Sequence, residues 1–335
     1  MTSASKVGVV VIGRNEGDRL LACLASVLSM NYPRELLDVV YVDSSSTDGS
    51  AALAQSLGVR AIVLSGPTTA ARGRNAGWAQ TSAPFILFLD GDTVLDKDFV
   101  GKNIGHFADP SIAGVFGNRR ETRTKESVYN AILDLDWNME PGWALFFGGD
   151  CLVRREALVL VTGYNDQLIA GEEPDMCRRM RGAGYRILHV DEPMTLHDLA
   201  MHRFSQYWRR SVRTGYAYAQ ISSFYANTDD PLWAADSRRN VVRACFWIGA
   251  PVLCALLSAV WRSWLPLSIF LLIALALWGR TGIKAARKTR SIRTLVAYSL
   301  HSHLQQIPIL AGQLRFWLSR ASGKGSRLIE YKRSA

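Results

Sequence analysis

The segment that decides the fold is Phe85–Thr93, whose sequence is FILFLDGDT. It begins after Pro84 with five apolar residues, too few to cross a membrane, so the pattern predicts a buried β-strand. Side chains alternate along a strand, and Asp90 and Asp92 are therefore expected to point to the same side at its carboxyl end. In open α/β sheets, ligands bind beyond the carboxyl ends of the strands. Two carboxylates at that position suit Mg²⁺ or Mn²⁺, although Asp-Gly is also a common turn sequence.

Strands and helices alternate through the N-terminal half of the chain. Apolar runs predict strands at 7–12, 39–42, 61–64 and 85–89, and helical spacing predicts helices at 18–30, 50–57 and 70–80. This order predicts an α/β fold with a mostly parallel sheet and helices on both faces. Neither a GxGxxG sequence after the first strand nor a P-loop lysine motif is present, which argues against a dinucleotide-dependent enzyme or an ATPase.

Composition narrows the choice of partners and compartment. The 335 residues include 39 Lys and Arg against 29 Asp and Glu, a formal net charge of +10. That charge suits nucleotides, lipid phosphates or an anionic membrane face. No nucleic acid is expected as a partner, because the first half carries no recognition motif or dense basic arm. The five cysteines form no CxxC pair, which predicts a reduced setting without a cysteine zinc site. Residues 1–6 carry no signal sequence, so the first half is expected to stay in the cytosol.

Four short motifs together resemble the family-2 glycosyltransferases, which are inverting enzymes with the Rossmann-like GT-A fold. The motifs are Asn15-Glu16, Val42-Asp43-Ser44 with Ser46–Gly49, Arg72–Gly77, and Asp90-Gly91-Asp92. The resemblance covers about residues 7–220. It implies a nucleotide-sugar donor that contacts Asn15, Glu16, Asp43, Arg74, Asn75 and Asp90. It also implies a DXD metal site of Asp90 and Asp92, with Asp92 as the direct ligand of Mg²⁺ or Mn²⁺. The family often has a second Asp at the position of Ser44, so the base of the donor (UDP or GDP) stays open.

An acidic segment in the second half resembles the catalytic segment of the same family. Gly171–Cys177 reads GEEPDMC, and by position Glu173 replaces the usual catalytic aspartate, with Glu172 beside it. A base is needed there because an acceptor hydroxyl is a poor nucleophile until it loses its proton. Clustered carboxylates repel one another, which can raise a pKa toward neutrality. The alternative is favourable negative charge at a helix N-terminus, which suits Asp175 best.

Two further positions complete the predicted site. Gly149 follows Gly148 and precedes Asp150; a glycine there permits close approach of a ligand such as the acceptor, or marks a turn. His197 follows an apolar stretch at 187–190, and some family members place a histidine metal ligand here. A lone histidine can equally be structural.

The segment Gln206–Arg210, QYWRR, resembles the QxxRW motif of processive polysaccharide synthases, except that Arg210 stands where tryptophan belongs. Arginine favours phosphate at that position. Gln206, Arg209 and Arg210 are therefore expected to bind the acceptor or its diphosphate. The helix is also basic and aromatic, a composition that suits a membrane surface.

The C-terminal third is predicted to contact a membrane. Residues 241–261 and 264–278 are apolar and joined by a short link, which predicts a transmembrane helical hairpin, although two buried helices of a soluble domain would look similar. Basic residues flank both ends and place those ends in the cytosol. Residues 294–319 contain interrupting polar groups and favour an amphipathic interfacial helix over a third span.

These patterns give a predicted domain organisation. Residues 1–220 form the GT-A domain and end in an interfacial helix, residues 221–240 are a linker, and residues 241–280 form the transmembrane hairpin. Residues 281–335 form a basic cytosolic segment with the amphipathic helix.

The predicted function is that of a membrane-anchored, metal-dependent inverting glycosyltransferase. It would move a sugar from a UDP- or GDP-sugar to a lipid-linked (polyisoprenyl diphosphate) saccharide acceptor, at the cytoplasmic face of the plasma (inner) membrane, in exopolysaccharide or surface-glycan biosynthesis. A polyisoprenyl-phosphate glycosyltransferase, a processive synthase and a catalytically inactive binding scaffold stay open as alternatives. Membrane lipids are expected partners, and a homo-oligomer stays open.

Overall fold

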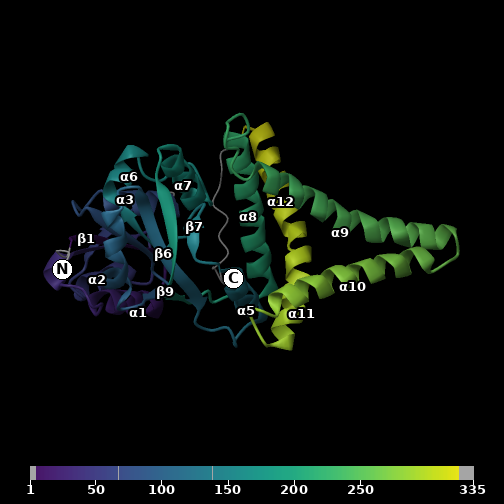
Figure 1. The fold of residues 1–335 in the computed structure, drawn as a ribbon, viewed down its shortest axis with the longest axis horizontal. Coiled ribbons are helices and arrows are strands. Elements are labelled where there is room, and N and C mark those ends of the chain that lie inside the picture. The colour runs from purple at the N-terminus through teal and green to yellow at the C-terminus, as the bar shows by residue number, and fades with distance from the viewer. Residues whose placement is uncertain (1–4, 67, 138, 324–335) are drawn as a thin grey trace. The chain divides into compact units, whose positions relative to one another are not determined.

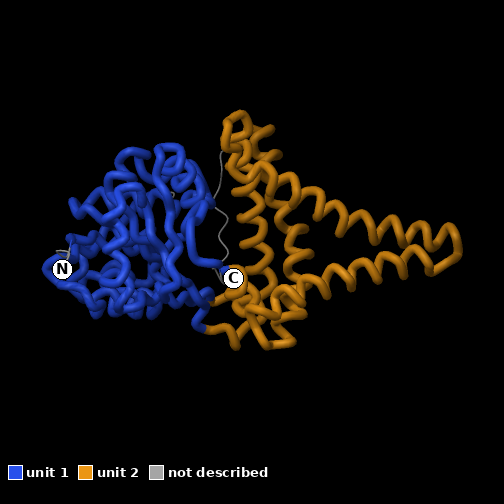
Figure 2. Tube along the Cα trace, in the orientation of Figure 1, with its two compact units in different colours: residues 1–122, 137–199 blue, residues 123–136, 200–335 orange. Residues whose placement is uncertain are grey.

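The computed structural model describes residues 5–66, 68–137 and 139–323. They form two compact units, one within 1–122 and 137–199 and the other within 123–136 and 200–335 (Figure 2). The first unit is built around a β-sheet and the second is helical. The units therefore divide near residue 200, whereas the sequence predicted a boundary at residue 220. The reason is that helix α8 (Phe204–Phe224) packs along α12 (Gln306–Ala321) inside the helical unit.

A nine-stranded sheet forms the centre of the first unit, with the order β3-β2-β1-β4-β8-β6-β9-β5 and with β7 paired to β9. The strands are β1 (Val7–Gly13), β2 (Leu37–Asp43), β3 (Arg60–Val63), β4 (Phe85–Asp90), β5 (Thr93–Leu95), β6 (Ile112–Glu121), β7 (Gly142–Ala144), β8 (Cys151–Arg154) and β9 (Arg186–His197). Strands β1 to β4 are parallel to one another, as predicted, and β6 is parallel to β9. Strands β5, β7 and β8 pair in antiparallel fashion, so the sheet as a whole is mixed.

Helices lie on both faces of this sheet (Figure 1). They are α1 (Asp18–Leu28), α2 (Ser50–Ser56), α3 (Ala70–Trp78), α4 (Phe99–Asn103), α6 (Arg155–Leu160) and α7 (Glu172–Gly182), with 3₁₀ turns at Arg34–Leu36 and Ile104–Ala108. The core lies between the layers. The apolar residues of β1 and the segment Ile86–Leu89 of β4 are buried, as their apolar runs predicted.

The register of the strands brings the polar strand ends together. Asp90 pairs with Ile12 across β4 and β1, and Asp43 pairs with Gly13 across β2 and β1. The chain leaves β1 toward β2 on one side, while β4 lies on its other side. Such a reversal of strand order opens a crevice at the carboxyl ends of the strands, where α/β proteins bind their ligands.

The second unit consists of helices α5 (Val128–Trp137, of which Trp137 belongs to the first unit), α8, α9 (Ala234–Val260), α10 (Leu265–Ala285), α11 (Ile292–Leu304) and α12. Helices α8 and α12 cross at Gly215 and Gly312. A Cβ at Gly215 would overlap the backbone of Ile309, and one at Gly312 would overlap the backbone of Val212. These two glycines therefore allow the helix backbones to touch.

Helices α9 and α10 form the predicted hairpin, with a turn at Arg262-Ser263 (Figure 1). Both are long and apolar enough to cross a membrane, and most of their apolar windows is exposed. Trp247 and Trp278 stack between them, with ring centroids 5.7 Å apart. The predicted linker 221–240 is partly helical, because α9 already begins at Ala234.

The predicted single helix at 294–319 is in fact two helices, α11 and α12, that meet at Gln305. Pro308 explains the break. A proline has no N–H for the carbonyl four residues earlier, and its ring clashes with that group. The carbonyl concerned is that of Leu304, where α11 ends. One face of α12 packs on α8, and Leu314, Trp317 and Leu318 are exposed.

The close crossing of α8 and α12 leads to a test of the helical unit. Gly312→Ala is expected to lower the free energy of unfolding by about 1–3 kcal/mol, because the added methyl must push two backbones apart. Gly249→Ala in α9 is the matched control, since nothing lies within 4 Å of its added Cβ; it should be neutral or slightly stabilising. Thermal unfolding in detergent measures both, and equal melting temperatures for the two variants would contradict the packing argument.

Candidate functional site

Two loops at the carboxyl ends of β1 and β2 are held against each other. The amide of Asn15, which has a left-handed backbone (φ 55°), donates to Ser46 Oγ at 2.9 Å, and its Oδ1 accepts from the Thr47 amide at 2.7 Å. The Asp43 carboxylate accepts from Tyr41 Oη at 2.9 Å and from the Ser46 amide at 2.7 Å. The structure thus brings Asn15 and Asp43 together at the Ser46–Thr47 segment, in a preformed polar rim.

Glu16 lies beside the Asp90-Gly91-Asp92 turn. Its Oε2 is 2.7 Å from Arg19 Nη2, and a Cβ added at Gly91 would lie 3.4 Å from its Cγ. The first loop is therefore close to the end of β4. These contacts join the predicted nucleotide side of the site to the paired aspartates.

Arg74 is the centre of the site. Its side chain is 3% exposed, and its Nη2 is 2.8 Å from Asp90 Oδ1. Its Nη1 is 2.8 Å from Glu173 Oε1 and 3.1 Å from Glu172 Oε1. One guanidinium on α3 therefore binds carboxylates from β4 and from the N-terminus of α7. The sequence placed Arg74 near the nucleotide but gave no sign that it also holds the predicted catalytic pair.

The Glu173 carboxyl has an unusual acidity. Burial, together with repulsion from Glu172, raises the pKa of Glu173 to about 7, although Arg74 acts in the opposite direction. A carboxyl that titrates near neutral pH can accept a proton and still be partly ionised under working conditions. This is the property that a general base requires.

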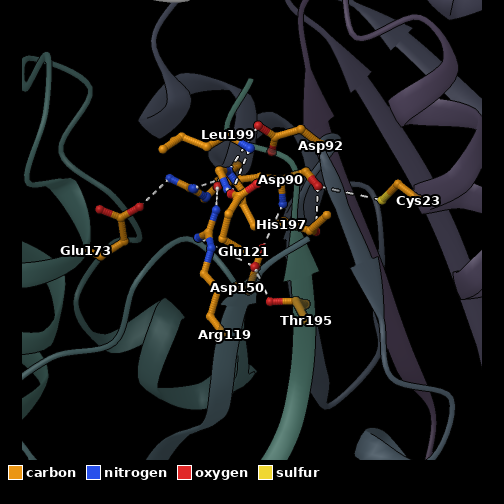
Figure 3. A network of polar contacts seen from close by, with 12 residues as sticks. Cys23, Asp90, Asp92, Arg119, Glu121, Asp150, Glu173, Thr195, His197 and Leu199 are labelled. Atoms are coloured by element: carbon orange, nitrogen blue, oxygen red, sulfur yellow. Dashed lines mark hydrogen bonds and ion pairs between the residues drawn. The ribbon is translucent and has the colours of Figure 1, made fainter. Parts of the chain in front are cut away.

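A second arginine and a third aspartate, which the sequence did not predict, extend the network (Figure 3). Asp150 accepts from the Asp90 amide at 3.0 Å and from Thr195 Oγ1 at 2.7 Å. The Arg119 guanidinium lies 3.5 Å from Asp150 Oδ2 and 3.6 Å from Asp90 Oδ2. Burial raises the pKa of Asp150, and Arg119 opposes that rise. The only sequence signal for Asp150 was its place directly after Gly149.

Gly149 is required by the packing of the site. A Cβ at this position would lie 2.6 Å from both Arg74 Nη2 and Asp90 Oδ2. The glycine therefore gives room to the Arg74–Asp90 ion pair. From the sequence, we expected Gly149 to make room for a ligand or to mark a turn.

Asp92 and His197 form a donor pair that fits a divalent cation. Asp92 Oδ2 and His197 Nε2 are 3.1 Å apart, and both side chains are buried. Neighbouring ligands of an octahedral ion with bonds of about 2.1 Å are about 3.0 Å apart. His197 Nδ1 faces Glu121 Oε2 at 3.4 Å, which resembles the outer carboxylate that orients many metal-binding histidines.

No group of three or more His, Cys, Asp or Glu side chains within the described residues is arranged to hold a metal ion. Two protein ligands are nevertheless enough for Mg²⁺ or Mn²⁺ when substrate phosphates complete the shell. The donor set therefore fits an ion that binds together with a phosphorylated substrate.

The Asn75 side chain forms its hydrogen bonds with neighbouring protein groups. Its Oδ1 accepts from the Tyr164 amide at 2.9 Å and from Trp78 Nε1 at 3.1 Å. Its Nδ2 donates to the Tyr164 carbonyl at 2.8 Å and to Asp166 Oδ1 at 2.6 Å. Both amide hydrogens and the oxygen are thus engaged, so the structure gives Asn75 a supporting role behind Arg74.

Gln206, Arg209 and Arg210 belong to α8 in the helical unit. Gln206 is buried, and its Oε1 accepts from the amides of His202 at 2.9 Å and Arg203 at 3.0 Å. It therefore caps the start of α8, a structural use that the motif did not reveal. Arg209 is exposed. A role of Arg209 and Arg210 toward an acceptor stays a prediction.

Known proteins resemble this chain along most of its length. The family described as Glycosyl transferase family 2 matches residues 8–159, and Glycosyl transferase family group 2 matches residues 85–280. Glycosyltransferase AglE of Haloferax volcanii is 22% identical over 72% of this chain and 79% of its own. The poly-beta-1,6-N-acetyl-D-glucosamine synthase of Staphylococcus aureus is 24% identical over 59% of this chain, which spans about half (51%) of that relative.

A solved structure shares the fold. The mannosyltransferase PcManGT from Pyrobaculum calidifontis, in complex with GDP-Man and Mn²⁺, aligns with a TM-score of 0.68 at 18% identity. The alignment covers 95% of this chain and 89% of that one. The similarity shows a common GT-A-like architecture.

The buried position of Arg74 predicts a large, pH-dependent effect of its removal. Arg74→Met should lower the free energy of unfolding by about 3–5 kcal/mol at pH 8, because it leaves buried carboxylates without their cation. Without Arg74 the pKa of Glu173 in the folded state rises further above its unfolded value, because Arg74 is the group that lowers it, so the loss should shrink as the pH falls toward 5.

Arg60→Met is the matched control, since Arg60 forms an exposed ion pair with Asp38; its cost should stay below about 1 kcal/mol. Denaturant unfolding at pH 5 and pH 8 measures both variants. A loss for Arg74→Met that is as small as the control's, or that does not change with pH, would argue against the central role of this arginine.

Proposed function

Because this chain belongs to glycosyl transferase family 2, we propose that it transfers a sugar from a UDP- or GDP-sugar to a lipid-linked saccharide, with inversion at the sugar carbon. The observation that carries the proposal is the position of Arg74. It holds Asp90, at the donor side of the site, and Glu173, the carboxylate that titrates near neutral pH. Through Arg74, the carboxylate on the donor side and the proposed base belong to one buried cluster.

The proposed reaction is a single displacement. Glu173 takes the proton from the acceptor hydroxyl. The hydroxyl oxygen bonds to the sugar carbon at the same time, and the bond from that carbon to the nucleotide diphosphate breaks. The attacking oxygen and the leaving diphosphate lie on opposite sides of the carbon, so the configuration inverts. Asp92 and His197 would hold a divalent cation, which when bound supplies Lewis-acid stabilisation of the diphosphate. Arg119 lies beside Asp90 and adds positive charge near the same group.

The donor side uses the preformed rim. Asn15, Glu16 and Asp43 are proposed to contact the nucleotide, because the loops that carry them are fixed before a ligand arrives. Preorganised groups lose little freedom on binding and so favour a correctly aligned complex. Asn75 contributes indirectly, by fixing the loop around Tyr164.

The acceptor is proposed to be carried on a membrane lipid. The α9–α10 hairpin has the length and apolar surface to anchor in a bilayer. Lys284 lies in the last turn of α10, and Arg287, Lys288, Arg290 and Arg293 follow the helix closely. Basic residues beside a span mark its cytosolic end, where nucleotide sugars are available. A relative named as a polysaccharide synthase supports a role in exopolysaccharide or surface-glycan assembly.

The first test is metal-dependent release of nucleotide by the detergent-purified chain. A panel of UDP- and GDP-sugars is supplied with Mn²⁺, Mg²⁺ or a chelator, and with a membrane lipid extract as acceptor. One donor should give release that the chelator abolishes and that Asp92→Asn lowers by more than about 100-fold. Asp38→Asn, an exposed surface change, should leave release unchanged. Release that survives both the chelator and Asp92→Asn would refute the metal site.

The second test concerns the base. Glu173→Gln should lower transfer by about 10²- to 10⁴-fold while donor affinity stays within about threefold, because the amide cannot accept the proton. In the wild type, activity should fall as the pH drops below about 7, since protonation of Glu173 removes the base. Glu192→Gln, at an exposed pair with Lys102, is the control and should keep that profile. Loss of donor binding in Glu173→Gln would show that the residue binds the donor instead.

A further inference from the structure

A buried hydroxyl next to the site has no role in the reaction described so far. Tyr164 lies in the loop between α6 and α7 and is 3% exposed. Among the described residues its Oη is buried and has no hydrogen-bond partner. Leaving a buried donor without a partner is costly, and a phenylalanine of nearly the same shape would avoid that cost. We therefore expect the hydroxyl to form a hydrogen bond at another stage of the reaction, when substrate is bound.

The position of Tyr164 is fixed by several independent contacts. The Asn75 side chain brackets its backbone, with hydrogen bonds to its amide at 2.9 Å and to its carbonyl at 2.8 Å. Gly163 precedes it in a left-handed conformation (φ 67°), and a Cβ there would lie 2.5 Å from Asn75 Oδ1. The Phe88 ring packs on the Tyr164 ring at 5.4 Å between centroids, nearly perpendicular to it. These contacts fix the position of Tyr164.

In this position Tyr164 lies beside Arg74, which in turn contacts the proposed base Glu173. The Arg74 guanidinium lies over its ring, 5.5 Å from the centroid, and the same guanidinium contacts Glu173 at 2.8 Å. Burial raises the pKa of Tyr164, so its phenol is a protonated donor at neutral pH. The ionisable groups that act on it most strongly are Cys151, Arg74, Glu173 and Cys177. Only Glu173 among these is a carboxylate that can accept a strong hydrogen bond.

Substrate binding would create the need for this donor. Arginine binds phosphate groups through charge-assisted hydrogen bonds, and Arg74 already contacts Asp90 on the donor side. A nucleotide diphosphate at that side would compete for the guanidinium and weaken its contact with Glu173. An ionised carboxylate in a buried site then loses a partner, at the moment when it must be ready to accept a proton.

We propose that Tyr164 is a positioning residue for the proposed base: its hydroxyl donates a hydrogen bond to the Glu173 carboxylate when the diphosphate draws Arg74 away. The proposal rests on the proposed function, because it assigns a diphosphate to the donor side and a proton to Glu173. Tyr164 stays protonated throughout, and no bond to it is made or broken. The hydrogen bond holds one carboxylate oxygen and leaves the other directed at the acceptor hydroxyl.

Tyr164→Phe separates this role from a merely structural one. It keeps the ring over Arg74 and removes only the hydroxyl, so folding is expected to be intact. If the hydroxyl stayed unpaired at every stage, its removal would raise the melting temperature and leave the kinetics unchanged. If it supports Glu173, kcat should fall about tenfold while the KM for the donor stays within about twofold. The acid limb of the kcat profile should move to higher pH, because loss of a donor to the ionised form raises the pKa of the base.

The kinetic experiment uses the full chain in detergent, with the donor that the release assay identifies. It compares wild type, Tyr164→Phe and Tyr32→Phe across pH 5 to 9, together with their melting temperatures. Tyr32 is the matched control, because its hydroxyl donates to the Ser5 carbonyl at 2.5 Å. Its variant should keep the wild-type acid limb. A Tyr164→Phe variant that is more stable and equally active, with an unshifted acid limb, would overturn the proposal.

A second measurement needs no turnover. The Glu173 carboxyl is labelled with carbon-13, its signal is assigned by its loss in Glu173→Gln, and it is titrated with and without saturating UDP or GDP. The ionisable groups that interact with this carboxyl in the free protein are Glu172 and Cys177 on its own helix, Arg74 on α3, Asp90 on β4, Cys151 on β8 and Tyr164. With nucleotide bound, the signal should titrate at higher pH in Tyr164→Phe than in the wild type. Identical nucleotide-bound titrations would overturn the proposal, whereas failure of nucleotide release alone would count only against the proposed function.

Discussion

The site depends on one buried cation among carboxylates. Asp90, Glu172 and Glu173 come from two different elements, and without a counter-charge they could not all be ionised at such close range. The Arg74 guanidinium resolves this because its planar fork presents separate N–H groups in two directions. A lysine would offer a single point charge and could not reach both sides with the same geometry. Helix α3, the end of β4 and the start of α7 are therefore mutually dependent.

The mixed sheet explains how the supporting residues reach this arginine. Strand β8 runs antiparallel to β4, with Cys151 opposite Phe88, so the residues before β8 arrive at the same edge as Asp90. This is what places Gly149 against the ion pair and lets Asp150 accept from the Asp90 amide. A parallel strand at that position would bring its other end to the site.

Elements with a regular apolar pattern were predictable from the sequence, whereas features that depend on packing between distant segments were not. The long apolar runs predicted β1 and β4, and the polar residues after these runs marked where the strands end, because strand period and strand ends are local properties. Strands β5 and β7 have three residues each, too few to show a period. Asp150 joined the site through pairing over 60 residues of chain, which no local pattern reveals. For Asn75 the motif gave the position correctly, but its hydrogen bonds are used by the loop at Tyr164.

Charge also explains why an acidic site suits a basic protein. The chain carries a formal net charge of +10, yet the site itself is rich in carboxylates. Asp90, Asp150, Glu172 and Glu173 lie beside Arg74 or Arg119, and Asp92 and Glu121 lie beside His197. The overall charge attracts an anionic nucleotide from a distance, while the local carboxylates would repel it at contact. In the proposed reaction Asp92 and His197 would hold a divalent cation whose charge would offset that repulsion, so donor and cation should bind more tightly together than either does alone. Under the proposed reaction, such an acidic site would favour a nucleotide that binds together with a divalent cation.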